Sequence, residues 1–308
     1  LLASHVEATT ARLAAVPLVL AVQDTTELDW TAHPATTGLG PLAHPAHQGL
    51  HVHTTLALTP ERVPLGLLAQ QVWARDPADT GKRATRKRRP VAEKESQKWL
   101  TSIEAVIAAH AQCPQTRFVG IGDREADVYD LFLQERPSGV DLLVRASWNR
   151  RVDHPERYLW AKVEAHPVGA TLTVRVSRCD AQPARQATVT VRGGWVLLCP
   201  PTHRRAEKLP TLAVWAVLAR EDHPPAGVEP LEWLLLTTCA VHTPEDAIER
   251  VTWYACRWGI EVWHKVLKSG CRLEARQLET AERLRRCLAV YSVIAWRSLY
   301  ATMLSRAV

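Results

Sequence analysis

The chain has 308 residues, of which 46% are hydrophobic and 23% are charged, and its formal net charge is +6. These proportions are ordinary for globular proteins, and a chain of this length can bury a large core in one or two domains. It contains no run of about 18 uncharged apolar residues, and its start lacks the basic-then-apolar order of a secretory signal. We therefore expect a cytoplasmic protein that does not span a membrane.

The seven cysteines are odd in number, form no C-x2-C pair and fall in predicted strands and helices. This pattern favours small buried thiols in a reducing compartment over a disulfide or zinc framework. The chain starts without methionine, and its last residues still read as a helix. We therefore expect it to be a piece of a longer protein.

One segment carries a surplus of positive charge that equals that of the whole chain. Between Lys82 and Lys98 the chain carries eight basic residues against Glu93 and Glu95, a surplus of 8 − 2 = 6 that equals the whole net charge. Such a run is consistent with a solvated loop. It is also consistent with contacts to a phosphate backbone, because clustered Lys and Arg displace counterions from nucleic acid.

The first half of the chain alternates between strand and helix patterns. Buried or alternating apolar runs predict strands at 17–23, 50–58, 63–73, 117–122 and 140–146, and helical periodicity predicts helices at 93–111 and 125–135. This order fits a mixed sheet flanked by helices, as in RNase H-like folds. The first and fourth of these strands are predicted to end at Asp24 and Asp123, where ligand sites of open α/β sheets lie.

The second half begins with a β-rich segment. Val/Thr alternation and the turn signals at Gly193-Gly194 and Pro200-Pro201 predict an insertion in the α/β core. We therefore expect a first core part at 1–148, a β-rich insertion at 149–231, and a second core part at 232–308. The strands of the β-rich segment are expected at 171–176, 187–192, 211–219 and 231–238. Helices are expected after them at 245–268 and 280–306.

The first of these two helices carries Tyr254, Arg257, Glu261, Lys265 and Lys268, which are separated by three, four, four and three residues. At roughly 100° per residue, the five side chains fall within an arc of about 80° on one helical face. A single carboxylate among a phenol and three cations suits a site that holds a metal beside a polyanion. A solvated amphipathic helix with an i,i+4 Glu–Lys pair is the alternative.

Asp24, Asp123 and Glu261 can form a three-carboxylate cluster. Hard divalent cations such as Mg²⁺ bind through a few carboxylates, water and substrate phosphate oxygens. Two such ions about 4 Å apart support an in-line displacement at phosphorus. Either aspartate alone could equally be a capping residue, since Asp is common at turns.

Three local motifs resemble those of one protein family. Tyr254 to Lys268 match Y-x2-R-x3-E-x6-K, while Asp24-Thr25-Thr26 and the segment Gly122–Asp127 resemble the first and second catalytic motifs of bacterial insertion-sequence transposases with a DDE triad. This family includes the Tn-five and Tn-ten elements. The motifs occur in the family's order, with the β-rich insertion between the second and third, and the resemblance spans about residues 17 to 300.

The resemblance implies that Asp24, Asp123 and Glu261 bind two Mg²⁺ ions, for which Mn²⁺ could substitute. It implies cut-and-paste transposition through a DNA hairpin, without a covalent enzyme–DNA intermediate. The implied partners are double-stranded transposon ends and target DNA, and the full-length protein is expected to act as a dimer at the bacterial nucleoid.

The resemblance also implies DNA contacts. Tyr254, Arg257 and Lys268 would bind the phosphate near the cleaved end, and Lys265 is an additional candidate contact. Trp233 falls where the family places an aromatic residue that stacks on a flipped base, and Arg145 is a candidate phosphate contact. For Trp233 the competing interpretation is a core position, since the chain has 12 Trp.

Two other functions stay open. The first is a nuclease of the same fold that hydrolyses DNA or an RNA–DNA hybrid without strand transfer. The second is an inactive or domesticated remnant that only binds DNA, because the family's terminal recognition and pairing regions are not recognisable here. Glu125 and Asp127 lie near Asp123 but are expected to cap or pair locally.

Overall fold

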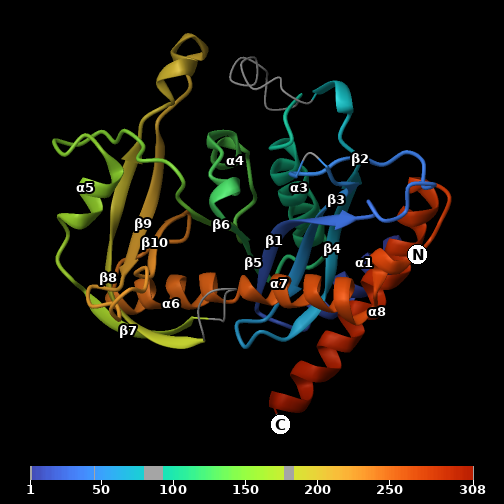
Figure 1. Ribbon diagram of the computed structural model, residues 1–308. Coiled ribbons are helices and arrows are strands. Elements are labelled where there is room, and N and C mark those ends of the chain that lie inside the picture. The colour runs from blue at the N-terminus through green and yellow to red at the C-terminus, as the bar shows by residue number, and fades with distance from the viewer. Residues whose placement is uncertain (1, 45, 80–92, 177–183, 308) are drawn as a thin grey trace. The chain divides into compact units, whose positions relative to one another are not determined.

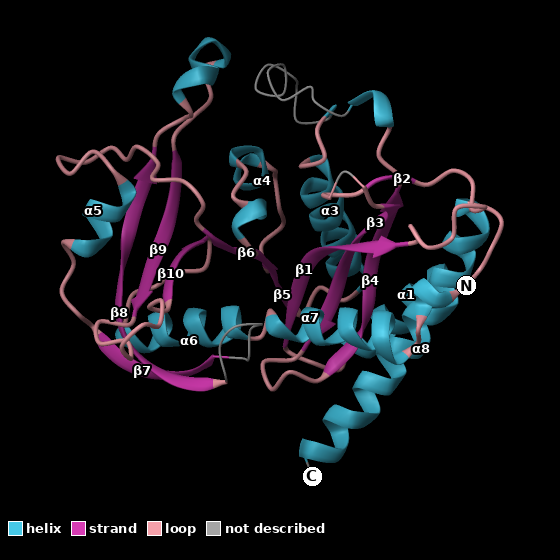
Figure 2. Cartoon of the chain, in the orientation of Figure 1, coloured by secondary structure: helices cyan, strands magenta, loops and turns pink. Residues whose placement is uncertain are grey.

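The computed structural model of the protein describes residues 2–44, 46–79, 93–176 and 184–307 (Figure 1). Six of the eight residues in the predicted basic run, Lys82 to Arg89, lie outside the described residues. The fold is mixed α/β, with mostly antiparallel strands flanked by helices, as Figure 2 shows. The six described cysteines are free thiols, as predicted.

The chain forms two compact units. Unit 1 comprises Leu1–Gly120, Pro137–Val140 and Cys256–Val308, and unit 2 comprises Ile121–Arg136 and Asp141–Ala255. The predicted three-part division at residues 148 and 231 stays a prediction.

The sheet of unit 1 is built around β3 (Gln48–Leu58), in which every residue after Gln48 is buried. It pairs antiparallel with β1 (Leu18–Asp29) on one side and with β4 (Pro64–Trp73) and the short β2 (Gly40–Pro41) on the other. Next to β1 in the strand order stands β5 (Arg117–Gly122). The strands predicted in this part of the sequence are therefore present.

The predicted end of the first strand at Asp24 is wrong. Strand β1 continues to Asp29, and its ladder with β3 runs without interruption through Asp24↔Thr54 to Asp29↔Gly49. The apolar run stops at Gln23 because the following side chains are partly exposed, but the backbone keeps its hydrogen-bonding partner. Burial changes at this point, while pairing does not.

Four α-helices and three short helical turns lie among the described residues of unit 1. They are α1 (Leu2–Leu13), α3 (Gln97–Gln112), α7 (Trp258–Lys265), α8 (Ala281–Ala307), the π-helical turn η5 (Val266–Gly270), and the 3₁₀ turns η1 (Pro77–Asp79) and η6 (Leu273–Ala275). The helix predicted at 93–111 thus begins later, at Gln97, while the predicted helix 280–306 is α8.

Helix α8 lies against β4. The Ser292 hydroxyl donates to Gln70 at 3.2 Å, and the Trp296 indole donates to the Pro64 carbonyl at 2.7 Å. By length and composition alone, Ala281–Ser305 of α8 is the one segment among the described helices that could cross a membrane, with a mean hydropathy of 1.3. Core helices of soluble proteins meet the same criterion.

Unit 2 contains an antiparallel sheet in the order β6 (Val140–Arg145), β10 (Glu232–Thr237), β9 (Leu212–Arg220), β8 (Arg185–Leu198) and β7 (Ala170–Val176). The strands of the predicted insertion therefore extend the sheet that β6 and β10 begin. The helices of this unit are η3 (Arg124–Ala126), α4 (Tyr129–Leu133), α5 (Leu159–Glu164), η4 (Thr202–Glu207) and α6 (Pro244–Ala255).

The turn predicted at Gly193-Gly194 is also wrong, because β8 passes straight through both residues. A Cβ atom on Gly194 would lie 2.4 Å from the His166 Nε2 atom, and one on Gly193 would lie 3.2 Å from a methyl of Val241. These glycines permit close packing on the strand rather than a change of direction.

Helix α1, which the sequence did not predict, is fixed to β4 by buried polar contacts. The Leu67 amide donates to His5 Nε2 at 3.1 Å, and the Arg12 guanidinium donates to the Leu65 carbonyl at 2.8 Å. Between them, Gly66 has a φ of +149°, and a Cβ atom there would lie 2.1 Å from the Thr9 Oγ1 atom. The helix therefore approaches β4 to a distance that only glycine permits.

We expect Gly66→Ala to destabilise unit 1 by more than about 1 kcal/mol, because it adds both an unfavourable φ and a steric clash. Gly270→Ala is the matched control, since its Cβ would meet only Val266 at 3.5 Å and its φ is not in the positive region. Urea unfolding of both variants measures the difference. Equal stabilities would contradict the packing of α1 described above.

Candidate active site

Asp24 projects from β1 toward α7. Its Oδ1 atom accepts a hydrogen bond from the Thr25 amide at 2.9 Å, and its side chain is 19% exposed. Because successive side chains of a strand point to opposite faces, Thr25 projects the other way. There its hydroxyl lies 2.9 Å from the His53 Nδ1 atom on β3.

Helix α7 brings a second carboxylate to the same face of β1. Arg257 Nη2 lies 2.5 Å from Glu261 Oε1, an i,i+4 pair, and Arg257 Nη1 lies 3.7 Å from Asp24 Oδ2. One guanidinium thus stands between two carboxylates that are 237 positions apart in the sequence (261 − 24). Unit 1 therefore brings Asp24, Arg257 and Glu261 together.

A histidine that the sequence reasoning missed completes this cluster. His264 Nδ1 lies 3.9 Å from Asp24 Oδ2. Burial, followed by the charges of Lys268 and Arg257, lowers the pKa of His264 to about 3, so its imidazole is neutral at pH 7. The only signal in the sequence was its place three residues after Glu261, on the same helical face.

His53 on β3, which Thr25 contacts on the other face of the sheet, is also neutral. Burial is the largest cause that lowers its pKa to about 3, and the charge of Lys98 adds to it. Its ring meets that of Trp99 on α3 edge-on, with centroids 4.6 Å apart. Neither His53 nor His264 has a hydrogen-bond partner at Nε2 among the described residues.

The predicted single helix 245–268 is wrong. Helix α6 ends at Ala255, a turn with 3₁₀-type hydrogen bonds follows at Cys256 and Arg257, and α7 begins at Trp258. After Lys265 the chain forms the π-helical turn η5, closed by a hydrogen bond from the Cys271 amide to the Val266 carbonyl at 2.8 Å. The 100° spacing assumed for the stripe does not hold through these irregular turns.

The members of the stripe consequently have different surroundings. Tyr254 belongs to unit 2, while Arg257, Glu261, Lys265 and Lys268 belong to unit 1. Lys265 is exposed on α7. Lys268 Nζ lies 3.8 Å from a Glu274 carboxylate oxygen, which also accepts the Asp29 amide at 2.9 Å.

In unit 2, Asp123 directly follows β5, as predicted. It is the N-cap of η3, and its Oδ1 atom accepts the Glu125 amide at 2.9 Å. This is the local capping role that the sequence left open as the alternative to metal binding.

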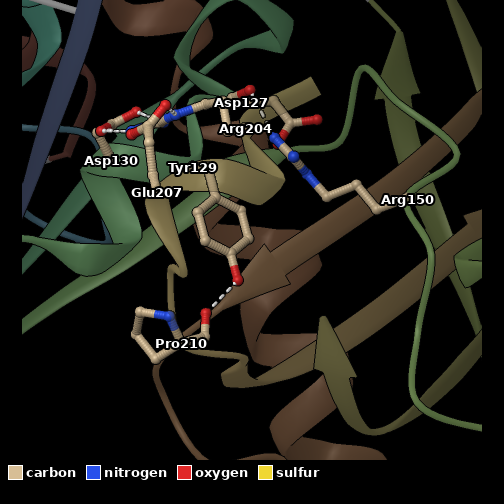
Figure 3. Close-up of polar contacts among 7 residues, drawn as sticks. All are labelled: Asp127, Tyr129, Asp130, Arg150, Arg204, Glu207 and Pro210. Carbon is tan, nitrogen blue, oxygen red and sulfur yellow. Dashed lines mark hydrogen bonds and ion pairs between the residues drawn. The ribbon is translucent and has the colours of Figure 1, made fainter. Parts of the chain in front are cut away.

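Asp127, at the other end of η3, is fully buried and paired with Arg150 (Figure 3). Its Oδ1 atom accepts two guanidinium hydrogen bonds, at 2.6 and 3.0 Å. Its Oδ2 atom accepts the amides of Ser147 and Trp148 at 2.7 and 3.1 Å. A single carboxylate therefore holds the loop that follows β6.

A second ionic cluster in Figure 3 fixes η4 to α4. Arg204 forms paired hydrogen bonds with both Asp130 and Glu207, and these bonds raise its pKa. The Tyr129 hydroxyl donates to the Pro210 carbonyl at 2.7 Å, and burial raises the pKa of Tyr129 to about 12. The connection between β8 and β9 is therefore held at both ends.

The predicted DNA contacts of unit 2 lie close together in the fold. The rings of Trp233 on β10 and Tyr254 on α6 meet edge-on, with centroids 5.0 Å apart at 70°. Tyr254 is buried and Trp233 is half-buried. Arg145, at the end of β6, donates to the Glu232 carbonyl at 2.8 Å.

Carboxylate oxygens are suitable ligands for a divalent cation in unit 1. Mg²⁺ commonly uses only one or two protein carboxylates, together with water and substrate phosphate oxygens, so Asp24 and Glu261 fit its requirements. The described residues contain no group of three or more His, Cys, Asp or Glu side chains that could hold a metal ion on their own. No family model matches the chain.

Acidification should destabilise unit 1 through its buried histidines. An unfolded histidine takes up a proton below about pH 6.5, whereas folded His53 does so only near pH 3, so stability is lost as the pH falls between these values. Between pH 7 and pH 5 this amounts to about 2 kcal/mol for His53. In urea unfolding, the free energy of unfolding of His53→Gln should fall less between pH 7 and pH 5 than that of wild type, by this amount.

For each protein, the free energy of unfolding at pH 5 is subtracted from that at pH 7. Any destabilisation by the substitution that is the same at both pH values therefore cancels. The same pH dependence in wild type and His53→Gln would show that His53 is not held neutral by the fold.

Asp127→Asn should destabilise unit 2 by about 3–5 kcal/mol, because it leaves the Arg150 charge buried without its partner. The matched control is Asp130→Asn, since Asp130 is more exposed and Arg204 retains Glu207. That change should cost about 1 kcal/mol or less. Chemical denaturation followed by far-UV circular dichroism compares them, and the reverse order would refute the role given to Asp127.

Proposed function

We propose that the chain is the catalytic core of a cut-and-paste DNA transposase of the DDE type, with an RNase H-like arrangement of its first strands. The observation that carries the proposal is the cluster in unit 1, where Asp24 and Glu261 share the Arg257 guanidinium. Sequence motifs assign these residues to the first and third catalytic positions. Their proximity supports the assignment, because residues of two motifs that are far apart in the sequence contribute to one cluster.

Asp24, Asp123 and Glu261 are the proposed ligands of two Mg²⁺ ions, and the assignment of Asp123 rests on its motif. The bound ions would supply a Lewis acid for phosphodiester cleavage and strand transfer. Arg257 is the proposed phosphate ligand, because its planar guanidinium can bind a carboxylate and a phosphate oxygen at once.

The remaining proposed DNA contacts are Lys265, Lys268 and Tyr254, with Trp233 as the residue that stacks on a flipped base. Arg145 is a further proposed phosphate contact. The proposed partners are double-stranded transposon ends and target DNA, in a dimer of the full-length protein at the bacterial nucleoid. Cleavage through a hairpin is taken from the family resemblance.

Two alternatives make different use of the same residues. A nuclease of this fold would cleave DNA but would not join a pre-cleaved end to a target. A remnant that only binds DNA would do neither. Arg257 and the two lysines near Glu261 favour the transposase, since a hydrolase has no need to keep hold of the product end.

We expect Glu261→Gln, Asp24→Asn and Asp123→Asn each to lower Mg²⁺-dependent cleavage of the element's own end by about 10³-fold, as loss of several kcal/mol of charge stabilisation requires. Glu125→Gln is the control, because it changes a carboxylate only two residues from Asp123. Gel analysis of labelled DNA ends measures cleavage. Equal cleavage by wild type and Glu261→Gln would show that Glu261 takes no part in the reaction.

The same preparations, given pre-cleaved ends and a plasmid target, separate the transposase from the nuclease. Joined products that disappear in the three carboxylate variants support the transposase. Hydrolysis without joined products would establish the nuclease instead, and metal-independent DNA binding alone would establish the remnant.

A further inference from the structure

Among the described residues of unit 2, three large aromatic side chains are exposed, and two of them, Trp148 and Tyr158, lie on neighbouring segments and have no part in the proposed reaction. Trp148, in the loop after β6, is 65% exposed, and Tyr158, just before α5, is 46% exposed. Tryptophan is highly buried on average, because its large apolar surface is unfavourable in water. Two exposed aromatic rings on neighbouring segments are therefore a candidate binding surface.

The backbone under Trp148 is fixed. The Trp148 amide donates to the fully buried Asp127 carboxylate, and the Arg150 side chain that pairs with Asp127 comes from the same loop. The Arg150 amide also donates to the Trp148 carbonyl at 2.9 Å. Trp148 is thus an exposed ring on a constrained loop, and binding would not have to order its backbone.

Asp127 also connects this loop to the second catalytic motif. It closes the segment Gly122–Asp127, in which Asp123 is the proposed metal ligand, and only the single turn η3 separates the two aspartates. The backbone of Trp148 is therefore held, through one carboxylate, to the segment that carries the proposed catalytic residue.

Tyr158 lies on the chain segment beside this loop. Arg151 and Tyr158 form an antiparallel bridge, and the Leu159 amide donates to the Arg150 carbonyl at 2.9 Å. The Trp160 amide donates to the Asn149 side chain at 3.1 Å. These contacts place the segment with Tyr158 alongside the residues that follow Trp148, and we call Trp148, Arg151 and Tyr158 the aromatic surface.

The sequence on either side of Trp148 is basic. The segment from Arg145 to Arg151 contains three arginines and no carboxylate. Arg150 is paired with Asp127, and the exposed Arg151 stands three residues after Trp148. The loop's two carboxylates, Asp153 and Glu156, lie in the turn beyond the Arg151–Tyr158 bridge.

We propose that the aromatic surface binds unpaired bases of single-stranded DNA, with Trp148 as the main stacking residue. Exposed aromatic rings beside cations are the usual means of binding single strands without sequence preference. The choice of DNA as the ligand rests on the proposed function. Trp148 acts in addition to Trp233, which is half-buried against Tyr254.

Binding of a fluorescein-labelled short oligothymidylate, followed by anisotropy without divalent metal, tests this proposal. Trp148→Ala should weaken binding by about 5- to 150-fold, the range expected for loss of one base–aromatic stack. Tyr158→Ala should weaken it less, and Trp148→Phe should stay within about threefold of wild type because a ring remains. Far-UV circular dichroism confirms folding of each variant.

Trp195→Ala is the matched control, since Trp195 is 50% exposed in the same unit but lies on β8. It should bind the oligonucleotide as wild type does. The proposal is overturned if wild type does not bind, if Trp148→Ala binds as tightly as wild type, or if Trp195→Ala loses as much affinity. It is also overturned if Trp148→Ala changes only self-association in sedimentation, because Trp148 would then contact protein.

The outcome is independent of the cleavage assay. Trp148-dependent binding by a protein that cleaves no DNA would uphold this inference and defeat the proposed function. Carboxylate-dependent cleavage together with unchanged binding by Trp148→Ala would uphold the proposed function and defeat this inference.

Discussion

The antiparallel pairing of β1 with β3 is the constraint on which the cluster in unit 1 depends. Ten consecutive residue pairs join the strands, from Leu20↔Leu58 to Asp29↔Gly49. Because side chains alternate along a strand, this register directs Asp24 toward α7 and Thr25 toward His53. A slip by one residue would exchange the two faces. The ladder therefore decides that a carboxylate, rather than a hydroxyl, meets Arg257.

Apolar runs were sufficient to predict the strands but not their ends. The run before Asp24 was visible in the sequence because both faces of β1 are buried there. Its continuation to Asp29 depends on a partner strand that no local pattern reveals. Gly193-Gly194 shows the same limit, since these residues resemble a turn locally but allow His166 and Val241 to pack on β8. Long-range packing decided both cases.

The spacing of charged residues predicted part of the cluster for a similar reason. Arg257 and Glu261 are four residues apart, so one helical turn is enough to pair them, and the prediction needs no knowledge of the fold. Tyr254 is separated from Glu261 by the turn at Cys256, and Lys268 lies within the π-helical turn. The helical spacing does not apply across either of these turns. His264 could be recognised only after burial had made its neutrality evident.

The charge of the cluster follows from that neutrality. Asp24, Glu261 and Arg257 sum to a formal charge of −2 + 1 = −1, and the pairing of Lys268 with Glu274 adds nothing to it. A protonated His264 would cancel this remaining negative charge next to Asp24. Burial lowers the pKa of His264 to about 3, so the imidazole stays neutral at neutral and mildly acidic pH. The buried imidazole of His264 on α7 therefore adds no positive charge beside Asp24, which is an electrostatic condition that the proposed cation binding requires.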